Sequence, residues 1–166
     1  FDRREAARQA EVYATFDVVW LEEPVSSGDL DGLVWLRDHV PPGTEIAAGE
    51  YLWDAAEARR MAPCVDVLQA DPTRCLGITG VRQLDGICAA RGISFSAHCA
   101  PQVSVHLCCG MEAAVHVEYF HDHARLESML FDGAIEPVDG WLRPDQRRPG
   151  LGLELRDDAA RFLSES

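Results

Sequence analysis

The sequence predicts an α/β fold, the C-terminal portion of a (β/α) barrel with about five βα units. Helical and strand patterns alternate along residues 1–119 at a nearly fixed interval, as is typical of a parallel sheet. An ionisable residue follows each predicted strand. Five strands that begin after a helix suit half of an eight-stranded barrel better than a complete open sheet. A barrel without its remaining strands would expose two sheet edges and the inner face of its core. We therefore expect a partial barrel over residues 1–119, with further strands before Phe1 in the full protein.

The expected helices carry apolar residues at the spacing of one helical face. In chain order these faces are Ala6, Ala10 and Tyr13; Leu30, Leu33 and Val34; Ala55, Ala58 and Met61; and Val81, Leu84 and Cys88. Asp54, with Glu57 three residues later, predicts the start of the third helix, and Gly92 is placed to end the fourth. Pro101 suits the first turn of a fifth helix, which we expect to run to about residue 114.

The expected strands are short apolar segments between turns and loops. They cover residues 17–21, 46–49, 65–70, 93–97 and 115–118. The first is continuously apolar, which predicts a strand buried on both faces. Beyond Tyr119 the alternation fails, because glycine and proline recur between residues 133 and 152. Residues 120–166 are therefore expected to form an irregular C-terminal segment of loops and a hairpin.

The composition restricts the classes of function. The chain has 166 residues, 47% hydrophobic and 26% charged, as is typical of a globular protein. Its formal net charge of −13 disfavours nucleic acid and membrane partners, because phosphate groups would be repelled. The apolar runs are too short to cross a bilayer and the first residues lack a signal peptide, so we expect a cytoplasmic protein. The six cysteines form no CxxC pair and are expected to be reduced and mostly buried.

Five ionisable residues are expected to ring one mouth of the barrel, since parallel barrels place reactive groups at the C-terminal ends of their strands. In chain order they are Glu22, Glu50, Asp71, His98 and Glu118, each one βα unit apart. Carboxylates at close range resist desolvation unless a cation neutralises them. Glu22 and Glu50 therefore predict a site for Mg²⁺, with Mn²⁺ as the alternative, and a third ligand on the strand before Phe1.

Five short motifs along the chain are informative by their order and spacing. They are Trp20-Leu-Glu-Glu-Pro24, Ala48-Gly-Glu50, Gln69-Ala-Asp-Pro72 followed by Gly77-Ile-Thr-Gly80, Ser96-Ala-His98 and Pro149-Gly-Leu-Gly152. In order and spacing the chain resembles the barrel half of the mandelate racemase subgroup (mandelate racemase/muconate lactonizing enzyme family) of the enolase superfamily. The resemblance implies a TIM-like barrel whose first strands and N-terminal capping domain lie outside this chain. Residues 120–166 are then expected to close on the barrel or on that capping domain.

The resemblance also implies a metal centre. Glu22 and Glu50 match the second and third metal carboxylates of the family, and Glu23 is expected to lie just behind them. Arg74 stands where relatives often have a lysine. It is expected either to pair with carboxylates in the mouth or to form a plain structural salt bridge.

The remaining residues at the mouth match the acid and base groups of the family. His98 matches the general base, and Asp71 matches its partner, a carboxylate that fixes the tautomer of the ring and supports an imidazolium. Glu118 matches the acid that donates a hydrogen bond to the substrate carboxylate, which requires it to stay protonated. Cys99 directly follows the base, and we interpret it as a packed, passive thiol.

By this resemblance the complete protein is a metal-dependent enzyme that removes the proton α to a carboxylate and forms an enediolate. We expect a dehydratase (a lyase) acting on aldonate-type sugar acids, with a racemase or epimerase of a 2-hydroxy acid (an isomerase) as the alternative. A truncated, inactive barrel fragment is the second alternative, and the isolated chain is expected to be inactive. The expected partners are a small carboxylic or sugar acid and further copies of the protein in a homo-oligomer.

Other sites are less favoured by the sequence. His116, His121 and His123 with Glu118 have the composition of a transition-metal cluster, but His121 and His123 follow the last strand in a loop. A zinc site built from cysteines lacks its usual spacing. A phosphate-binding barrel lacks a glycine-rich loop followed by lysine and serine or threonine.

Overall fold

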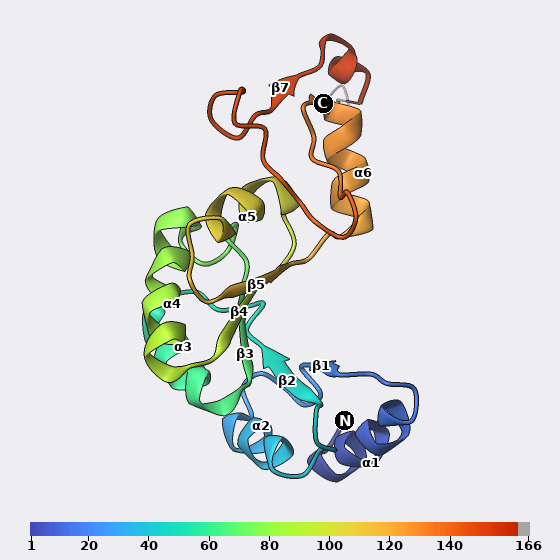
Figure 1. Ribbon diagram of the computed structural model, residues 1–166, viewed down its shortest axis with the longest axis vertical. Coiled ribbons are helices and arrows are strands. Elements are labelled where there is room, and N and C mark those ends of the chain that lie inside the picture. The colour runs from blue at the N-terminus through green and yellow to red at the C-terminus, as the bar shows by residue number, and fades with distance from the viewer. Residues whose placement is uncertain (163–166) are drawn as a thin grey trace.

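The computed structural model describes residues 1–162, and its main feature is a five-stranded parallel sheet with strand order β1-β2-β3-β4-β5 (Figure 1). The strands are β1 Trp20–Glu22, β2 Glu45–Ala48, β3 Val67–Ala70, β4 Ser94–Ala97 and β5 Ala114–Val117. Each strand pairs in parallel with the next one along the chain. An order without reversal is that of a barrel sector, whereas a doubly wound sheet reverses its strand order. The predicted partial (β/α) barrel is confirmed.

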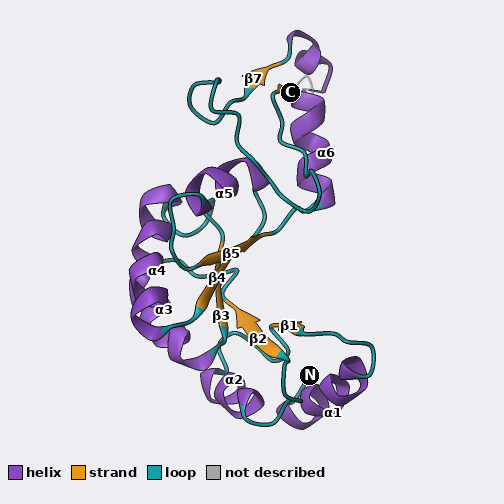
Figure 2. Ribbon diagram, in the orientation of Figure 1, coloured by secondary structure: helices purple, strands orange, loops and turns teal. Residues whose placement is uncertain are grey.

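Helices connect the strands and cover one side of the sheet. They are α1 Arg3–Ala14, α2 Leu30–Arg37, α3 Ala55–Met61, the short 3₁₀ helix η1 Ala62–Cys64, α4 Gly77–Arg91 and α5 Pro101–Cys108. Figure 2 shows α2 to α5 along the outer side of the curved sheet, while no helix among residues 1–162 covers its inner side. None of the described helices is both long and apolar enough to cross a bilayer.

The helix ends follow local chemistry in the sequence. The side chain of Asp54 accepts hydrogen bonds from the backbone N–H groups of Ala56 and Glu57, which supplies partners for the free donors at the start of α3. The carboxylate of Glu57 accepts from the N–H of Trp53 at 2.9 Å, so the predicted start of α3 is confirmed. Gly92 caps α4 with φ of 65°, a left-handed conformation that glycine adopts without steric cost.

The hydrophobic core lies between the sheet and its helices. Leu68 and Ala70 of β3 and Phe95 and Ala97 of β4 are fully buried in it. Because side chains alternate across a strand, the residues between and after them point to the inner side of the sheet. Those inner residues are Gln69, Asp71, Ser96 and His98. The alternation therefore separates a packed outer face from an inner face that carries polar groups.

Three details of the predicted burial are wrong. Tyr13, expected on the same face as Ala6 and Ala10, is 40% exposed. Val34 is 41% exposed, because Leu36 occupies the buried position beside Leu33 on α2. The first strand begins at Trp20, and Val18 and Val19 before it are exposed. Among the described residues β1 pairs only with β2, so this edge of the sheet has no neighbour to cover it.

The C-terminal region contains more regular structure than the sequence predicted. Helix α5 ends at Cys108 rather than near residue 114, and a further helix, α6 His121–Leu130, follows β5. No residue of α6 is buried and no side chain caps its start, so it lacks the signals by which a helix is recognised. The region contains the antiparallel pair β6 Phe131–Asp132 and β7 Glu154–Leu155, and a tight antiparallel turn between Val138 and Trp141. The 3₁₀ helix η2 Asp157–Phe162 follows β7.

Candidate active site

The register of β3 against β4 brings an acid and a histidine together. Gln69 pairs with Ser96 and Ala70 with Ala97, so the next residues of the two strands, Asp71 and His98, are also neighbours. The Nδ1 atom of His98 lies 3.1 Å from Oδ2 of Asp71. Both side chains are buried, with 8% of His98 and 3% of Asp71 exposed. A buried pair of this geometry is held in one orientation.

Asp71 is anchored by three further groups. Its Oδ1 accepts from the N–H of Thr73 at 2.7 Å and from the Thr73 hydroxyl at 2.6 Å, and the Arg74 guanidinium Nε lies 3.8 Å from Oδ2. Burial by itself raises the pKa of Asp71, but the hydrogen bonds from Thr73 and His98 and the charge of Arg74 outweigh it and lower that pKa. An ionised Asp71 fixes the proton of His98 on Nδ1 and leaves Nε2 with a free lone pair.

The other ring nitrogen of His98 faces carboxylates. Its Nε2 lies 2.9 Å from Oε2 of Glu50 and 3.7 Å from Oε2 of Glu118. Ligand atoms of Glu22, Glu50 and His98 all lie within 4.8 Å of one another. The structure therefore brings together all five residues that follow the predicted strands, since Glu22 ends β1 and the others come within two residues of a strand end.

The cluster has the donor atoms of a site for a hard cation. Glu22 and Glu50 offer carboxylate oxygens, the ligands that Mg²⁺ prefers. Glu23, placed behind them, accepts from the N–H of Gly49 at 3.4 Å. Burial raises the pKa of Glu23, and repulsion from Glu50 and Glu22 adds to this. The carboxylates repel one another, and a bound divalent cation would relieve this repulsion, so the residues present fit such an ion.

Arg74 connects two loops of the site. Its guanidinium donates to the backbone carbonyl of Glu50 at 3.1 Å and lies over the ring of Tyr51, 4.7 Å from the ring centroid. It also approaches Asp71, so it touches the loop after β2 and the loop after β3. Arg74 was expected either to pair with a carboxylate in the mouth or to form a structural contact, and it does both: it approaches Asp71 and it holds the backbone of Glu50.

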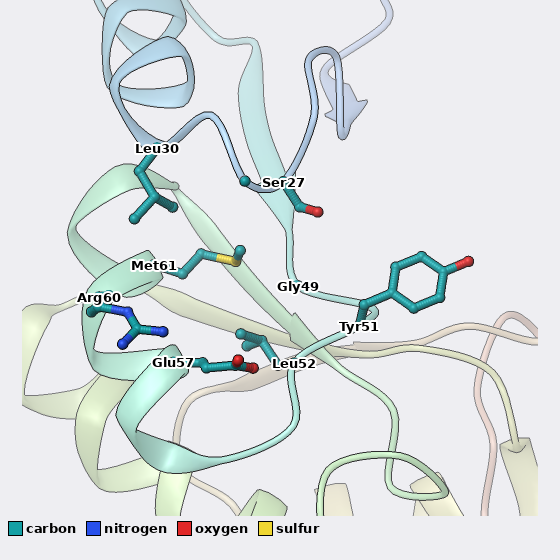
Figure 3. A pocket seen from close by; sticks show the side chains of 9 residues that line it. Ser27, Leu30, Gly49, Tyr51, Leu52, Glu57, Arg60 and Met61 are labelled. Carbon is teal, nitrogen blue, oxygen red and sulfur yellow. The ribbon is translucent and has the colours of Figure 1, made fainter.

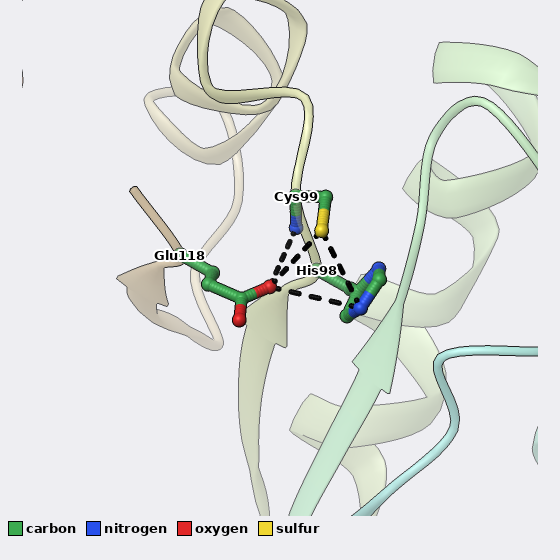
Figure 4. A group of neighbouring side chains, drawn as sticks. All are labelled: His98, Cys99 and Glu118. Carbon is green, nitrogen blue, oxygen red and sulfur yellow. Dashed lines mark hydrogen bonds and ion pairs between the residues drawn. The ribbon is translucent and has the colours of Figure 1, made fainter. Parts of the chain in front are cut away.

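Cys99, expected from the sequence to be a packed, passive thiol, is buried as expected but lies between His98 and Glu118 and contacts both (Figure 4). Its thiol donates to Oε2 of Glu118 at 3.3 Å and lies 3.4 Å from Nε2 of His98, and its backbone N–H donates to the same Oε2 at 3.0 Å. Burial raises the pKa of the thiol to about 12, with help from Glu118. Cys99 and Ala100 have φ of 49° and 43°, which turns the chain over the site. Its position directly after the histidine is the one sequence signal for this role.

The less favoured sites find no support among residues 1–162. His116, His121 and His123 join no metal-binding group there; His116 packs edge-on against Trp20, and Nδ1 of His123 accepts from the N–H of Ala100 at 3.4 Å. All six cysteines are free, and four of them are buried, as predicted.

A separate pocket of about 390 Å³ opens beside the loops after β1 and β2. Its lining includes Ser27, Leu30, Gly49, Tyr51, Leu52, Glu57, Arg60 and Met61 (Figure 3). None of the predicted site residues lines it, and the ring of Tyr51 points away from the side chains of Leu30 and Met61. The pocket therefore lies beside the cluster around His98, and Gly49 and Tyr51, the neighbours of Glu50 in the chain, belong to its lining.

The chain is similar to one family of known proteins and to several solved structures. Residues 1–159 match the sequence profile of a family described as enolase C-terminal domain-like. The chain is 54% identical to a mandelate racemase/muconate lactonizing enzyme-like protein from Rubrobacter xylanophilus, with a TM-score of 0.94 over 98% of this chain and 45% of that one. It is 30% identical to the L-talarate/galactarate dehydratase of Salmonella typhimurium, over 98% of this chain and 39% of that protein.

A third relative was solved with ligands. The structure of the L-talarate dehydratase from Polaromonas sp. JS666, complexed with Mg and L-glucarate, is 31% identical to this chain. Its TM-score is 0.84, over 99% of this chain and 43% of that one. The chain thus spans less than half the length of each of these relatives.

Proposed function

Because the chain belongs to the enolase C-terminal domain-like family, we propose that the complete protein removes the proton α to the carboxylate of a small acid and forms an enediolate. The observation that supports the proposal is the orientation of the His98 ring. Asp71 holds its Nδ1 at 3.1 Å, and its Nε2 faces the carboxylates at the ends of the neighbouring strands. A histidine oriented in this way is a general base.

His98 and Asp71 act as one unit in this proposal. The Nε2 atom of His98 receives the α-proton, and the ionised Asp71 stabilises the imidazolium that results. Thr73 holds Asp71 through Oδ1, which leaves Oδ2 for the histidine. Asp71 is therefore the positioning residue and His98 the catalytic one.

Glu22 and Glu50 would hold a Mg²⁺ ion, with Glu23 supporting the loop behind them through Gly49. The bound ion would supply positive charge next to the substrate carboxylate as a second negative charge develops there. The Polaromonas relative, which holds Mg, supports this choice, and no comparison supports the Mn²⁺ alternative.

Glu118 is the proposed hydrogen-bond donor to the substrate carboxylate. Its Oε2 already accepts from the N–H and the thiol of Cys99, so Oε1 is the atom that can carry the proton. Its side chain is 36% exposed, which leaves it accessible to a bound acid. A carboxyl group that donates a hydrogen bond to the substrate carboxylate would stabilise the enediolate as its negative charge develops.

Dehydration of a sugar acid is the overall reaction that we propose. Two of the relatives are named dehydratases of talarate or galactarate, and one holds L-glucarate. In such a reaction the enediolate expels a β-hydroxyl group, which His98 or a neighbouring acid can protonate as it leaves.

The test is proton exchange by the full-length protein in D₂O with Mg²⁺ and a pooled set of sugar acids and 2-hydroxy acids. We expect loss of water from a sugar acid, or deuterium incorporation at its α-carbon, read by mass spectrometry. His98→Asn and Asp71→Asn should each lower the rate by about 10²–10⁴-fold. Deuterium incorporation without water loss would indicate racemisation instead. If no acid exchanges while Mg²⁺ binding is demonstrated, the proposed function is wrong.

A further inference from the structure

The three side chains of Figure 4 form a ligand set of a different kind from the carboxylate pair Glu22 and Glu50. His98 offers an imidazole nitrogen, Cys99 a sulfur and Glu118 a carboxylate oxygen, and these atoms all lie within 4.8 Å of one another. Thiol and imidazole ligands favour Zn²⁺ and other borderline metals, whereas Mg²⁺ prefers oxygen alone.

The spacing of the three atoms matches a tetrahedral metal. The distances are 3.4 Å from Cys99 Sγ to His98 Nε2, 3.3 Å from Sγ to Glu118 Oε2, and 3.7 Å from Nε2 to Oε2. A zinc ion with bonds of about 2.3 Å to sulfur and about 2.0–2.1 Å to nitrogen and oxygen requires its ligand atoms to lie about 3.4–3.6 Å apart. The observed triangle departs from this by a few tenths of an ångström.

The backbone holds this triangle in place before any metal arrives. Cys99 and Ala100 both adopt the left-handed conformation, which few residues other than glycine adopt without support. The hydroxyl of Ser104 donates to the Cys99 carbonyl at 2.8 Å, and the Cys99 N–H donates to Glu118. Since Asp71 fixes Nδ1 of His98, only Nε2 can bind, and it is the atom that faces the sulfur.

We propose that His98, Cys99 and Glu118 form a second metal site, which binds Zn²⁺ or a similar thiophilic ion through Nε2, Sγ and Oε2. Cys99 and His98 are 4% and 8% exposed, and the more exposed Glu118 leaves one side open for entry and for a fourth ligand such as water. On binding, the thiol releases its proton to solvent and the sulfur binds as thiolate.

Zinc at this site inhibits the enzyme, a consequence that rests on the proposed function. The ion occupies Nε2 of His98 and Oε2 of Glu118, the atoms beside which proton transfer and carboxylate binding take place. A chelator that removes the ion restores activity, and Oε2 of Glu50, 2.9 Å from the same Nε2, places the proposed Mg²⁺ ligands directly beside this site.

Co²⁺ reports directly on the ligands, because a thiolate bound to tetrahedral Co²⁺ gives a charge-transfer band and strong visible absorption. The chelator-treated full-length protein, saturated with Mg²⁺, is titrated with Co²⁺ and then with Zn²⁺. We expect one equivalent of thiolate-bound Co²⁺, displaced by Zn²⁺, in the unmodified protein and in Cys109→Ser. The Cys109 variant is the matched control, since that thiol is exposed and outside the site.

In Cys99→Ser the charge-transfer band should disappear. Three results would overturn the proposal. The band could persist in Cys99→Ser, it could be lost in Cys109→Ser, or the unmodified protein could bind Co²⁺ without the band. If circular dichroism shows that Cys99→Ser does not fold, the Glu118→Gln variant provides the test. The proposal predicts that this variant keeps the charge-transfer band but binds Co²⁺ at least tenfold more weakly. An unchanged Co²⁺ affinity would contradict the proposal. The spectra need no substrate, so an absence of acid exchange would refute the proposed function and leave the test of this site intact.

Discussion

At Gly49 the backbone passes so close to β3 that no side chain fits. Its φ is +129°, and a Cβ atom built there would lie 2.3 Å from the carbonyl oxygen of Gln69. Glu50 is the next residue, and Gly49 also donates its N–H to Glu23. The glycine therefore sets the position from which Glu50 reaches Nε2 of His98.

Gly49→Ala should lower the free energy of unfolding by about 1–3 kcal/mol, because the new methyl group meets backbone atoms and the conformation is strained. It should also weaken Mg²⁺ binding, since Glu50 has to move. Gly86→Ala is the control: Gly86 lies exposed in α4 with open space around it, so alanine should raise the stability by about 0.5–1 kcal/mol. Urea unfolding measures the stability of both variants, and calorimetric titration measures their Mg²⁺ affinity. A change in the free energy of unfolding with the same sign in both variants would contradict this account.

The site residues were predictable to different degrees for physical reasons. Asp71 and His98 follow strands in a regular register, so the strand ends alone determine that they meet. Cys99 depends on a left-handed turn at two residues, neither of which is glycine or asparagine, and no local pattern indicates such a turn. Side-chain contacts that depend on loop conformation are therefore the part of a site that sequence patterns miss.

The first two helices of the chain are joined by one ion pair. Arg3 on α1 donates through Nε to Oδ2 of Asp29 at 3.0 Å, and Asp29 is also the N-cap of α2, accepting from the N–H of Gly32 at 3.0 Å. The hydrogen bond from Arg3 lowers the pKa of Asp29, and Gly32 contributes in the same direction. Asp29 therefore serves the helix start and the contact between helices at once.

Asp29→Asn separates the two roles, because asparagine still caps a helix but carries no charge. Asp29 has a lower pKa in the folded state than the unfolded value of about 3.9, so its ionic contribution is fully present above that value and is lost as the pH falls through the folded pKa. The stability advantage of the unmodified protein over Asp29→Asn should therefore decrease as the pH falls below about 3.9. Urea unfolding between neutral pH and pH 3 measures it, and a difference that does not change with pH would rule out the pair as its source.

The elements that pack on the sheet could be predicted from the sequence, whereas the helix that does not pack on it could not. The strand and helix positions from α1 to β5 follow from apolar periodicity, because each element buries one face in a common core. Helix α6 buries no residue, and its start at Phe120 lacks a capping side chain. A helix without a buried face has no pattern that distinguishes it from a loop.

At the scale of the whole molecule, the sheet and the C-terminal region are joined by few contacts. Figure 1 shows α6 and β7 extending beyond the sheet at the end of the molecule near α5. Gln102 of α5, 3% exposed, makes two of these connections: its amide nitrogen donates to the carbonyl of Leu151 and its amide oxygen accepts from the N–H of Ile135 at 2.9 Å. The hydroxyl of Tyr119 donates to the carbonyl of Ile135 at 3.2 Å. The division of the chain near residue 119 stays a prediction, and Gln102 is where it can be tested.

Gln102→Met keeps the length of the side chain and removes both hydrogen bonds. The N–H of Ile135 and the carbonyl of Leu151 then lose their partners, at a cost of about 1–3 kcal/mol for each buried group left unsatisfied. Amide hydrogen exchange should become faster by about tenfold or more at Ile135 and in residues 131–155, while β2 to β4 stay protected. Gln83→Met, at an exposed position of α4, is the control and should change neither region. Faster exchange throughout the sheet in Gln102→Met would show instead that the C-terminal segment and the barrel sector unfold as one cooperative unit.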